Sequence, residues 1–161
     1  MEISSLVALA AFFAACFAAA SSGAVFKPGL WYENLKKPRW NPPNWAFPVV
    51  WTTLFTMMAV SGWLVWQSAG VAAWPALTVY AVHLVINGVW SWLFFGKQRL
   101  DWAMVDVIFL WAMIVAMIIA FHPYSVLASL LLTPYLLWVT IAAVLNFRLL
   151  QMNGARGVGT A

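Results

Sequence analysis

The chain alternates long apolar stretches with short polar breaks, and five of the stretches are long enough to cross a membrane as helices. A spanning helix needs about 20 apolar residues, and these runs lack the alternating polarity of a membrane β-strand. The predicted helices cover residues 3–26, 45–67, 76–96, 102–121 and 125–150. The pattern therefore predicts an all-α integral membrane bundle of five transmembrane helices, forming a single domain over residues 1–161.

The composition agrees with this prediction and excludes other classes of protein. Of the 161 residues, 65% are hydrophobic and only 7% are charged, whereas a soluble domain carries about 25% charged residues. This polar surface is too small for a cytosolic enzyme, and the apolar content is too high for a disordered chain. The single cysteine, Cys16, excludes a disulfide framework and a cysteine-based metal site.

All the lysine and arginine residues fall on one side of a five-helix topology. They are Lys27, Lys36, Lys37, Arg39, Lys97, Arg99, Arg148 and Arg156. The positive-inside rule then places the long loop at residues 27–44 and the C-terminus in the cytoplasm. Because these cations are scattered, no nucleic-acid partner is expected, and they orient the protein and contact anionic lipid instead.

The loop at residues 27–44 is long and carries the aromatic residues Trp31, Tyr32 and Trp40 among its prolines and cations. A loop of this length in a compact protein is usually functional or disordered, and the aromatics favour a function. The next helix begins near Trp45, which is suited to the membrane interface. Trp51 lies six residues further on, roughly 9 Å inside the helix.

Side chains from three predicted helices reach a common layer of the membrane. Trp90 lies roughly 9 Å deep on the third helix, and Trp138 and Ala142 lie roughly 18 and 12 Å deep on the fifth. Asn87 shares the face of Trp90, and the cost of a polar amide in lipid should turn it inward. Two interpretations stay open. The layer is either a pocket whose flat aromatic walls stack on planar rings, or a tightly packed core in which Asn87 only joins helices.

Two further features concern helix packing and helix shape. The first predicted helix carries a small residue at every fourth position, namely Ala11, Ala15, Ala19 and Gly23. Such a stripe permits close approach of another helix, from the same bundle or from a second chain. Pro134 lies inside the fifth predicted helix, where its missing N–H should kink the helix.

The few ionisable groups within the predicted helices do not form a catalytic or metal-binding set. Asp106 lies roughly 6 Å inside the fourth helix, and Arg99, Lys97 and Arg148 are its candidate partners at the interface. His83 has no evident partner as a haem ligand, so a packing role is favoured. No metal site and no cofactor are expected.

Together these motifs resemble the tryptophan-rich sensory protein/translocator protein (TspO/MBR) family, also called the peripheral-type benzodiazepine receptor family. The most specific match is Trp40-x-Pro42-Pro43-x-Trp45-x-x-Pro48-x-x-Trp51. Further matches are Lys27-Pro28, Trp31-Tyr32-x-x-Leu35-x-Lys37-Pro38, Asn87-x-x-Trp90, Pro134-Tyr135-x-x-Trp138 and Leu145-Asn146-Phe147. The similarity extends from about Gly23 to Arg148.

The resemblance implies a five-helix bundle, often homodimeric, with a pocket for porphyrins such as protoporphyrin IX and haem. In mitochondrial members it implies binding of cholesterol and benzodiazepine-site drugs. The ligand-binding positions implied are Tyr32, Trp51, Asn87, Trp90, Trp138 and Ala142. Trp51 and Trp138 also match tryptophans tied to light-dependent porphyrin breakdown. Phe147 stands where the animal cholesterol motif has tyrosine, which weakens a prediction of tight sterol binding.

The sequence thus predicts a membrane receptor or sensor that binds porphyrins in an aromatic pocket and regulates tetrapyrrole or stress responses. The expected partners are a flat hydrophobic ligand, membrane lipid including sterol, and a second copy in a homodimer. The alternatives are a porphyrin or cholesterol transporter, an enzyme that degrades protoporphyrin IX through Trp51 and Trp138, and a purely structural bundle. The protein is expected in a bacterial membrane, and the sequence does not distinguish inner from outer.

Overall fold

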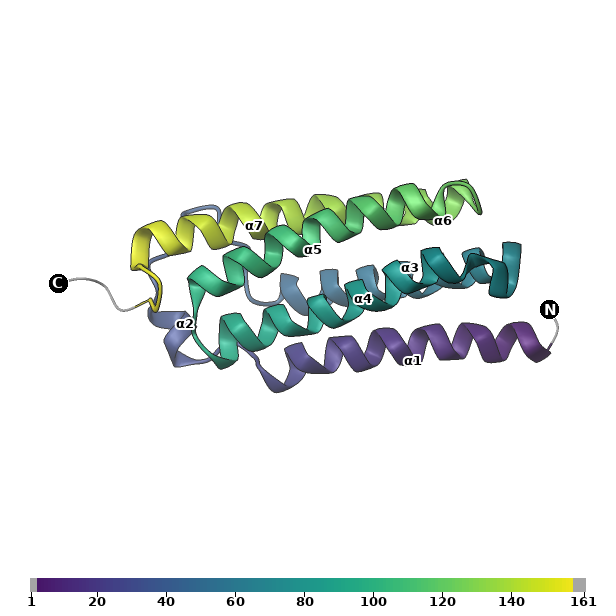
Figure 1. Ribbon diagram of the computed structural model, residues 1–161. Coiled ribbons are helices and arrows are strands. Elements are labelled where there is room, and N and C mark those ends of the chain that lie inside the picture. Colours follow the sequence, from purple (N-terminus) through teal and green to yellow (C-terminus); the bar gives the residue numbers. More distant parts are fainter. Residues whose placement is uncertain (1–2, 158–161) are drawn as a thin grey trace.

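The computed structural model describes residues 3–157, and within that range the chain is an all-helical bundle without strands. The long helices lie side by side along one direction (Figure 1). They are α1 (Ile3–Val25), α3 (Ala46–Ala69), α4 (Trp74–Ser91), α5 (Leu100–Phe121) and α7 (Thr133–Asn153). Short elements join them, namely α2 (Leu30–Asn34), the 3₁₀ turn η1 (Gly70–Ala73), the π-helical turn η2 (Trp92–Gly96) and α6 (Val126–Leu131). The predicted fold class is confirmed.

These helices are long and apolar enough to cross a membrane. The qualifying stretches are Ser4–Val25, Ala46–Gly96, Leu100–Phe121 and Val126–Asn153. The second stretch turns back on itself at η1 and so contains both α3 and α4 (Figure 1). Because a helix satisfies its own backbone hydrogen bonds, such apolar stretches are stable in lipid. The chain is an integral membrane protein.

The fifth predicted helix is interrupted at Leu132, which separates α6 from α7. Pro134 lies in the first turn of α7, where its missing N–H costs little. It does not kink the middle of a continuous helix as predicted. The hydroxyl of Thr133 donates to the carbonyl of Leu130 at 2.5 Å, so this carbonyl keeps a partner at the break.

The long loop contains the short helix α2 and is fastened to the end of α7. Asn153 accepts a hydrogen bond from the backbone N–H of Lys36 at 2.8 Å and donates to its carbonyl at 2.9 Å. The indole of Trp31 donates to the carbonyl of Arg156 at 3.1 Å. These contacts bring α2 and the last turn of α7 together at one end of the bundle (Figure 1).

The centre of the bundle is formed by α3, α4, α5 and α7, and α1 lies against its outside. Met58, Ile114, Met117 and Tyr135 are fully buried in this centre, whereas Cys16 is the one buried hydrophobic residue among the described side chains of α1. The helix α1 packs on α3 and α4. One wall of the bundle is therefore a single helix whose described side chains, apart from that of Cys16, are exposed or only partly buried.

The candidate pairing of Asp106 with a cation near the membrane surface is wrong. Arg99 pairs instead with Asp101, at 2.5 Å, in the only salt bridge within residues 3–157. Asp101 is two residues from Arg99 and lies at the start of α5, so it is the nearer partner. The Oδ2 atom of Asp106 is buried without a hydrogen-bond partner in the described part of the chain.

Candidate functional site

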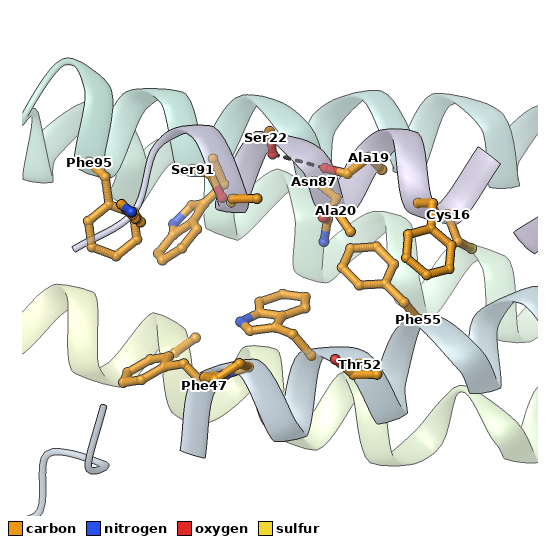
Figure 2. A pocket seen from close by; sticks show the side chains of 18 of the residues that line it. Cys16, Ala19, Ala20, Ser22, Phe47, Thr52, Phe55, Asn87, Ser91 and Phe95 are labelled. Atoms are coloured by element: carbon orange, nitrogen blue, oxygen red, sulfur yellow. Dashed lines mark hydrogen bonds between the residues drawn. The ribbon is translucent and has the colours of Figure 1, made fainter. Parts of the chain in front are cut away.

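A cavity of about 480 Å³ lies between α1 and α3. Its inner side is formed by residues of α4, η2, α5 and α7, including Asn87, Phe95, Leu110 and Ala142. Figure 2 shows Ala20 and Ser22 of α1 across the cavity from Phe47 and Thr52 of α3. The volume falls within the range of about 300–1,000 Å³ that is typical of small-molecule sites.

The cavity exists because α1 and α3 are in close contact at one end and are separated at the other. Near the start of α1, Phe12 packs on Gly62, where an added Cβ would lie 2.7 Å from the phenyl ring. The indole of Trp63 also donates to the carbonyl of Ser5 at 3.2 Å. Further along α1 the side chains facing α3 include the small Ala20, and these leave space between the helices.

Aromatic rings form the wall opposite α1. The rings of Trp51 and Phe55 lie 5.6 Å apart at an angle of 33°, and Trp51 also meets the edge of Tyr135 at 6.1 Å. Trp90 lies 4.9 Å from Phe94 at an angle of 31°. Because aromatic faces stack favourably on planar ring systems, this wall suits a flat apolar ligand.

A buried polar network lies directly behind this wall. Asn87 donates from Nδ2 to the Tyr135 hydroxyl at 2.7 Å, and Nε2 of His83 lies 2.8 Å from the same hydroxyl. His83 is fully buried and therefore has the packing role that its isolation in the sequence favoured. Asn87 joins α4 to α7 through this bond and also lines the cavity, and its contact with a ligand stays a prediction.

The structure divides the six predicted ligand-binding residues between two neighbouring spaces. Trp51, Asn87, Trp90 and Ala142 line the large cavity. Tyr32 and Trp138 line a separate void of about 20 Å³, which Trp90 and Ala142 also border.

Phe47 stands between the two spaces and lines both. Its ring packs 6.0 Å from that of Trp138, edge to face. Tyr32 is buried and donates its hydroxyl to Asn41 at 3.2 Å. Burial raises the pKa of the Tyr32 hydroxyl, so this group is a neutral donor near pH 7. Trp138 and Tyr32 do not line the large cavity, whereas Phe47, Trp90, Phe95 and Ala142 line both spaces.

Sequence reasoning missed the contribution of α1 to the cavity. Phe13, Cys16 and Ser22 line it, and the Sγ atom of Cys16 lies 3.0 Å from the Tyr80 hydroxyl. The small-residue stripe was the available signal, and Ala19 and Gly23 from that stripe line the cavity as well. The stripe shows where α1 leaves room, which helix-packing arguments alone do not reveal.

The cavity opens sideways between α1 and α3. Among its lining residues, Phe17 on α1 and Thr52 and Thr56 on α3 are exposed on the surface of the bundle. Lys27 and Asn44 are also exposed and mark the end of the cavity next to the loop. A ligand dissolved in lipid therefore has an opening through which to enter.

The described residues provide no metal site. Within residues 3–157, no group of three or more histidine, cysteine, aspartate or glutamate side chains is placed to hold an ion. The lining of the cavity offers aromatic rings, two amides, a few hydroxyls, a thiol and the ammonium group of Lys27. This arrangement supports non-covalent binding of an apolar molecule.

Comparison with known proteins gives consistent matches over nearly the whole chain. The family model described as the TspO/MBR family matches residues 6–152. Protein CrtK of Rhodobacter capsulatus is 40% identical over 154 residues, covering 92% of this chain and 94% of its own. The tryptophan-rich sensory protein of Cereibacter sphaeroides is 41% identical, covering 90% of each chain. The translocator protein of Bos taurus is 38% identical, covering 80% of this chain and 78% of its own.

Proposed function

This chain belongs to the TspO/MBR family, and from that membership we propose that it is a membrane sensor that binds planar tetrapyrroles, such as protoporphyrin IX and haem. The proposed site is the cavity between α1 and α3. Binding there would regulate a tetrapyrrole or stress response. We further propose that the protein acts as a homodimer in a bacterial membrane, with the loop at residues 27–44 on the cytoplasmic side.

The observation that carries this proposal is an open cavity with aromatic walls inside a membrane bundle. Trp51, Phe55 and Trp90 supply flat apolar surface, and Asn87 supplies one polar contact. Apolar walls with a small number of placed polar groups are the usual form of a small-molecule site. A stacked aromatic pair contributes about 0.5–1.5 kcal/mol beyond area burial, which favours a planar ligand over a flexible lipid chain.

The buried network gives the site a route to the rest of the bundle. Asn87 lines the cavity, and its amide is bonded to Tyr135 on α7. A ligand that pulls on the Asn87 amide therefore acts on the contact between α4 and α7. This is the kind of coupling that a sensor requires, because a signal needs a structural change outside the binding site.

The test is a titration of the purified full-length protein in nanodiscs with protoporphyrin IX, a sterol and a benzodiazepine-site drug, compared side by side. We expect saturable quenching of tryptophan fluorescence by protoporphyrin IX and a rise of the unfolding temperature with ligand concentration. Quenching that never saturates, together with an unchanged unfolding temperature, would show that the bundle is not a tetrapyrrole receptor.

Transport is the second candidate, and the sideways opening between α1 and α3 favours it. A transporter moves porphyrin or sterol across the membrane of proteoliposomes, and substitution of Asn87 stops that flux. A receptor binds without net flux.

Porphyrin degradation is the third candidate, and light and dark reactions separate it from binding. An enzyme consumes protoporphyrin IX in the dark and loses this activity in Trp51→Phe, whereas loss in light alone indicates photochemistry. Phe47 separates Trp138 from the large cavity, so Trp51 is the tryptophan of this pair that a ligand would touch.

A further inference from the structure

We infer that Lys27 makes this cavity selective for flat ligands that carry a carboxylate, with the acid group held at the mouth and the ring system inside. The inference rests on the proposed function, since it concerns the same cavity. It adds the residue that selects for the acid group and the direction in which the ligand lies.

The first argument is the charge of the lining. Lys27 is the only charged residue among those that line the cavity, and no aspartate or glutamate accompanies it. An anionic group at the mouth therefore meets one cation and no opposing carboxylate. Because the neighbouring walls are apolar, the attraction is screened less there than on an open surface.

The second argument is that the positive charge lies at one end of the cavity. The inner part of the cavity is lined by Phe13, Cys16 and Phe55, whereas the end next to the loop is lined by Lys27 and Asn44. The lining residues Cys16 and Ala24 are eight positions apart on α1, which corresponds to about 12 Å of helix. The apolar length is thus sufficient for the ring system of an amphipathic ligand, and the polar end suits its acid group.

Neighbouring contacts fix the position of the polar end. A Cβ on Gly23 would lie 3.6 Å from the Oγ atom of Ser91, so the last turn of α1 lies against the end of α4. Lys27 lies two residues after the end of α1 and lines the same cavity as Ser91. The cavity thus has one cation, Lys27, and a hydroxyl, Ser91, among the residues that line it.

The third argument is that the Lys27 ammonium is not engaged elsewhere. Lys27 is exposed, and the one salt bridge among the described residues joins Arg99 to Asp101. By contrast, Lys37 in the same loop donates to the carbonyl of Glu33 at 2.9 Å. Lys27 is therefore available to a ligand.

The experiment compares protoporphyrin IX, which has two carboxylates, with its dimethyl ester, which has none and keeps the same ring. Both are titrated against wild-type protein, Lys27→Gln and Lys36→Gln in nanodiscs of zwitterionic lipid. Lys36 is the matched control because it is an exposed lysine of the same loop that does not line the cavity. Zwitterionic lipid removes anionic headgroups that would compete for Lys27.

We expect Lys27→Gln to weaken binding of the diacid about fivefold while the ester binds as it does to the wild type. Lys36→Gln should leave both affinities unchanged. Added salt should reduce the difference in diacid affinity between the wild type and Lys27→Gln, since salt screens an exposed charge pair. Lys27→Glu should weaken the diacid further than Lys27→Gln, because it replaces attraction by repulsion.

Two results would overturn the inference. Equal weakening of diacid and ester binding in Lys27→Gln would assign Lys27 to packing, and unchanged affinities for both ligands would show that Lys27 contacts lipid instead. The failure of the proposed function is distinguishable from both. In that case neither the diacid nor the ester shows saturable binding to the wild-type protein.

Discussion

The Asn87 amide donates a 2.7 Å hydrogen bond to the Tyr135 hydroxyl, so a residue of the cavity wall is tied directly to a fully buried residue of α7. Nε2 of His83, one turn earlier on α4, lies 2.8 Å from the same hydroxyl. Since the hydroxyl accepts from Asn87, its own proton is free to be donated to Nε2 of His83. A single phenol thus contacts two buried polar side chains of α4, while Nδ1 of His83 has no hydrogen-bond partner among the described residues.

Removing this hydroxyl should destabilise the bundle. Tyr135→Phe leaves the Asn87 amide and the His83 ring without their shared partner, in surroundings where water does not replace it. We expect a loss of about 1–2 kcal/mol of unfolding free energy, measured by denaturant or thermal unfolding in micelles. The same variant should bind protoporphyrin IX differently, because the Asn87 amide becomes free to turn toward the cavity.

The matched control is Tyr124→Phe. Tyr124 is partly exposed, and its hydroxyl has no hydrogen-bond partner within residues 3–157. This substitution removes the same hydroxyl without breaking a hydrogen-bond network. The unfolding free energy of the variant should therefore stay close to that of the wild type. Equal losses in the two variants would show that the Tyr135 network does not stabilise the protein.

The tryptophans should differ in their effect on ligand binding according to their place around Phe47. Trp51→Ala should weaken binding of protoporphyrin IX most, because Trp51 lines the large cavity and an aromatic contact of this kind contributes about 0.5–1.5 kcal/mol beyond area burial. Trp138→Ala should have a smaller effect, since it acts through Phe47. Trp66→Ala should have the least, because Trp66 lies near the far end of α3 and outside the cavity lining.

Fluorescence titration of the three variants in nanodiscs provides the measurement. Similar affinities for all of them would indicate general partitioning of porphyrin into apolar surroundings. A larger loss in Trp138→Ala than in Trp51→Ala would show instead that Phe47 moves aside and that the two spaces join when ligand binds.

Filling the cavity should abolish binding without unfolding the protein. Ala20 lies on α1 and lines the cavity (Figure 2), so the ring in Ala20→Phe would occupy space that a ligand needs. The cavity already exists, so the ring does not have to displace packed core atoms. We expect at least tenfold weaker binding of protoporphyrin IX and an unfolding temperature at or above that of the wild type.

Ala18→Phe is the control for this prediction. Ala18 is an exposed residue of the same helix that does not line the cavity, and a ring there would extend into lipid. The affinity of the Ala18→Phe variant for protoporphyrin IX should therefore equal that of the wild type. If Ala20→Phe bound as tightly as Ala18→Phe, the ligand would have to occupy a different part of the protein.

The helices were predictable from the sequence because a run of about 20 apolar residues has few alternatives to a membrane helix. The position of Trp51, Asn87, Trp90 and Ala142 around one cavity was also predictable in part, since depth along a helix follows from its rise per residue. The depth of a residue along its helix does not show which other side chains lie between it and a cavity. Trp138 therefore reached the expected layer but lies behind Phe47.

Other features depend on contacts between distant segments, which periodicity does not encode. The helix α2 spans only Leu30–Asn34, so it is too short to give a helical pattern. The role of α1 was hidden for a different reason. Its residues are apolar on every side, so the face toward the cavity resembles the face toward lipid, and Cys16 carries no signal that distinguishes it.

The attachment of the long loop to α7 leads to a final prediction, which concerns access to the loop. The Asn153 side chain bonds both the N–H and the carbonyl of Lys36, at 2.8 and 2.9 Å, and no other described side chain is hydrogen-bonded to the Lys36 backbone. Asn153→Ala removes both bonds at a net cost of about 1–2 kcal/mol. Because proteolysis follows the population of locally opened chain when opening is fast, trypsin should cleave this variant after Lys36 about tenfold faster than the wild type.

The control is Asn34→Ala, because Asn34 is an exposed asparagine of the same loop. This variant should be cleaved at the wild-type rate. The cleavage of nanodisc-embedded protein is followed by mass spectrometry, and equal rates for the two variants would mean that the loop is held mainly by the burial of Tyr32 and Leu35.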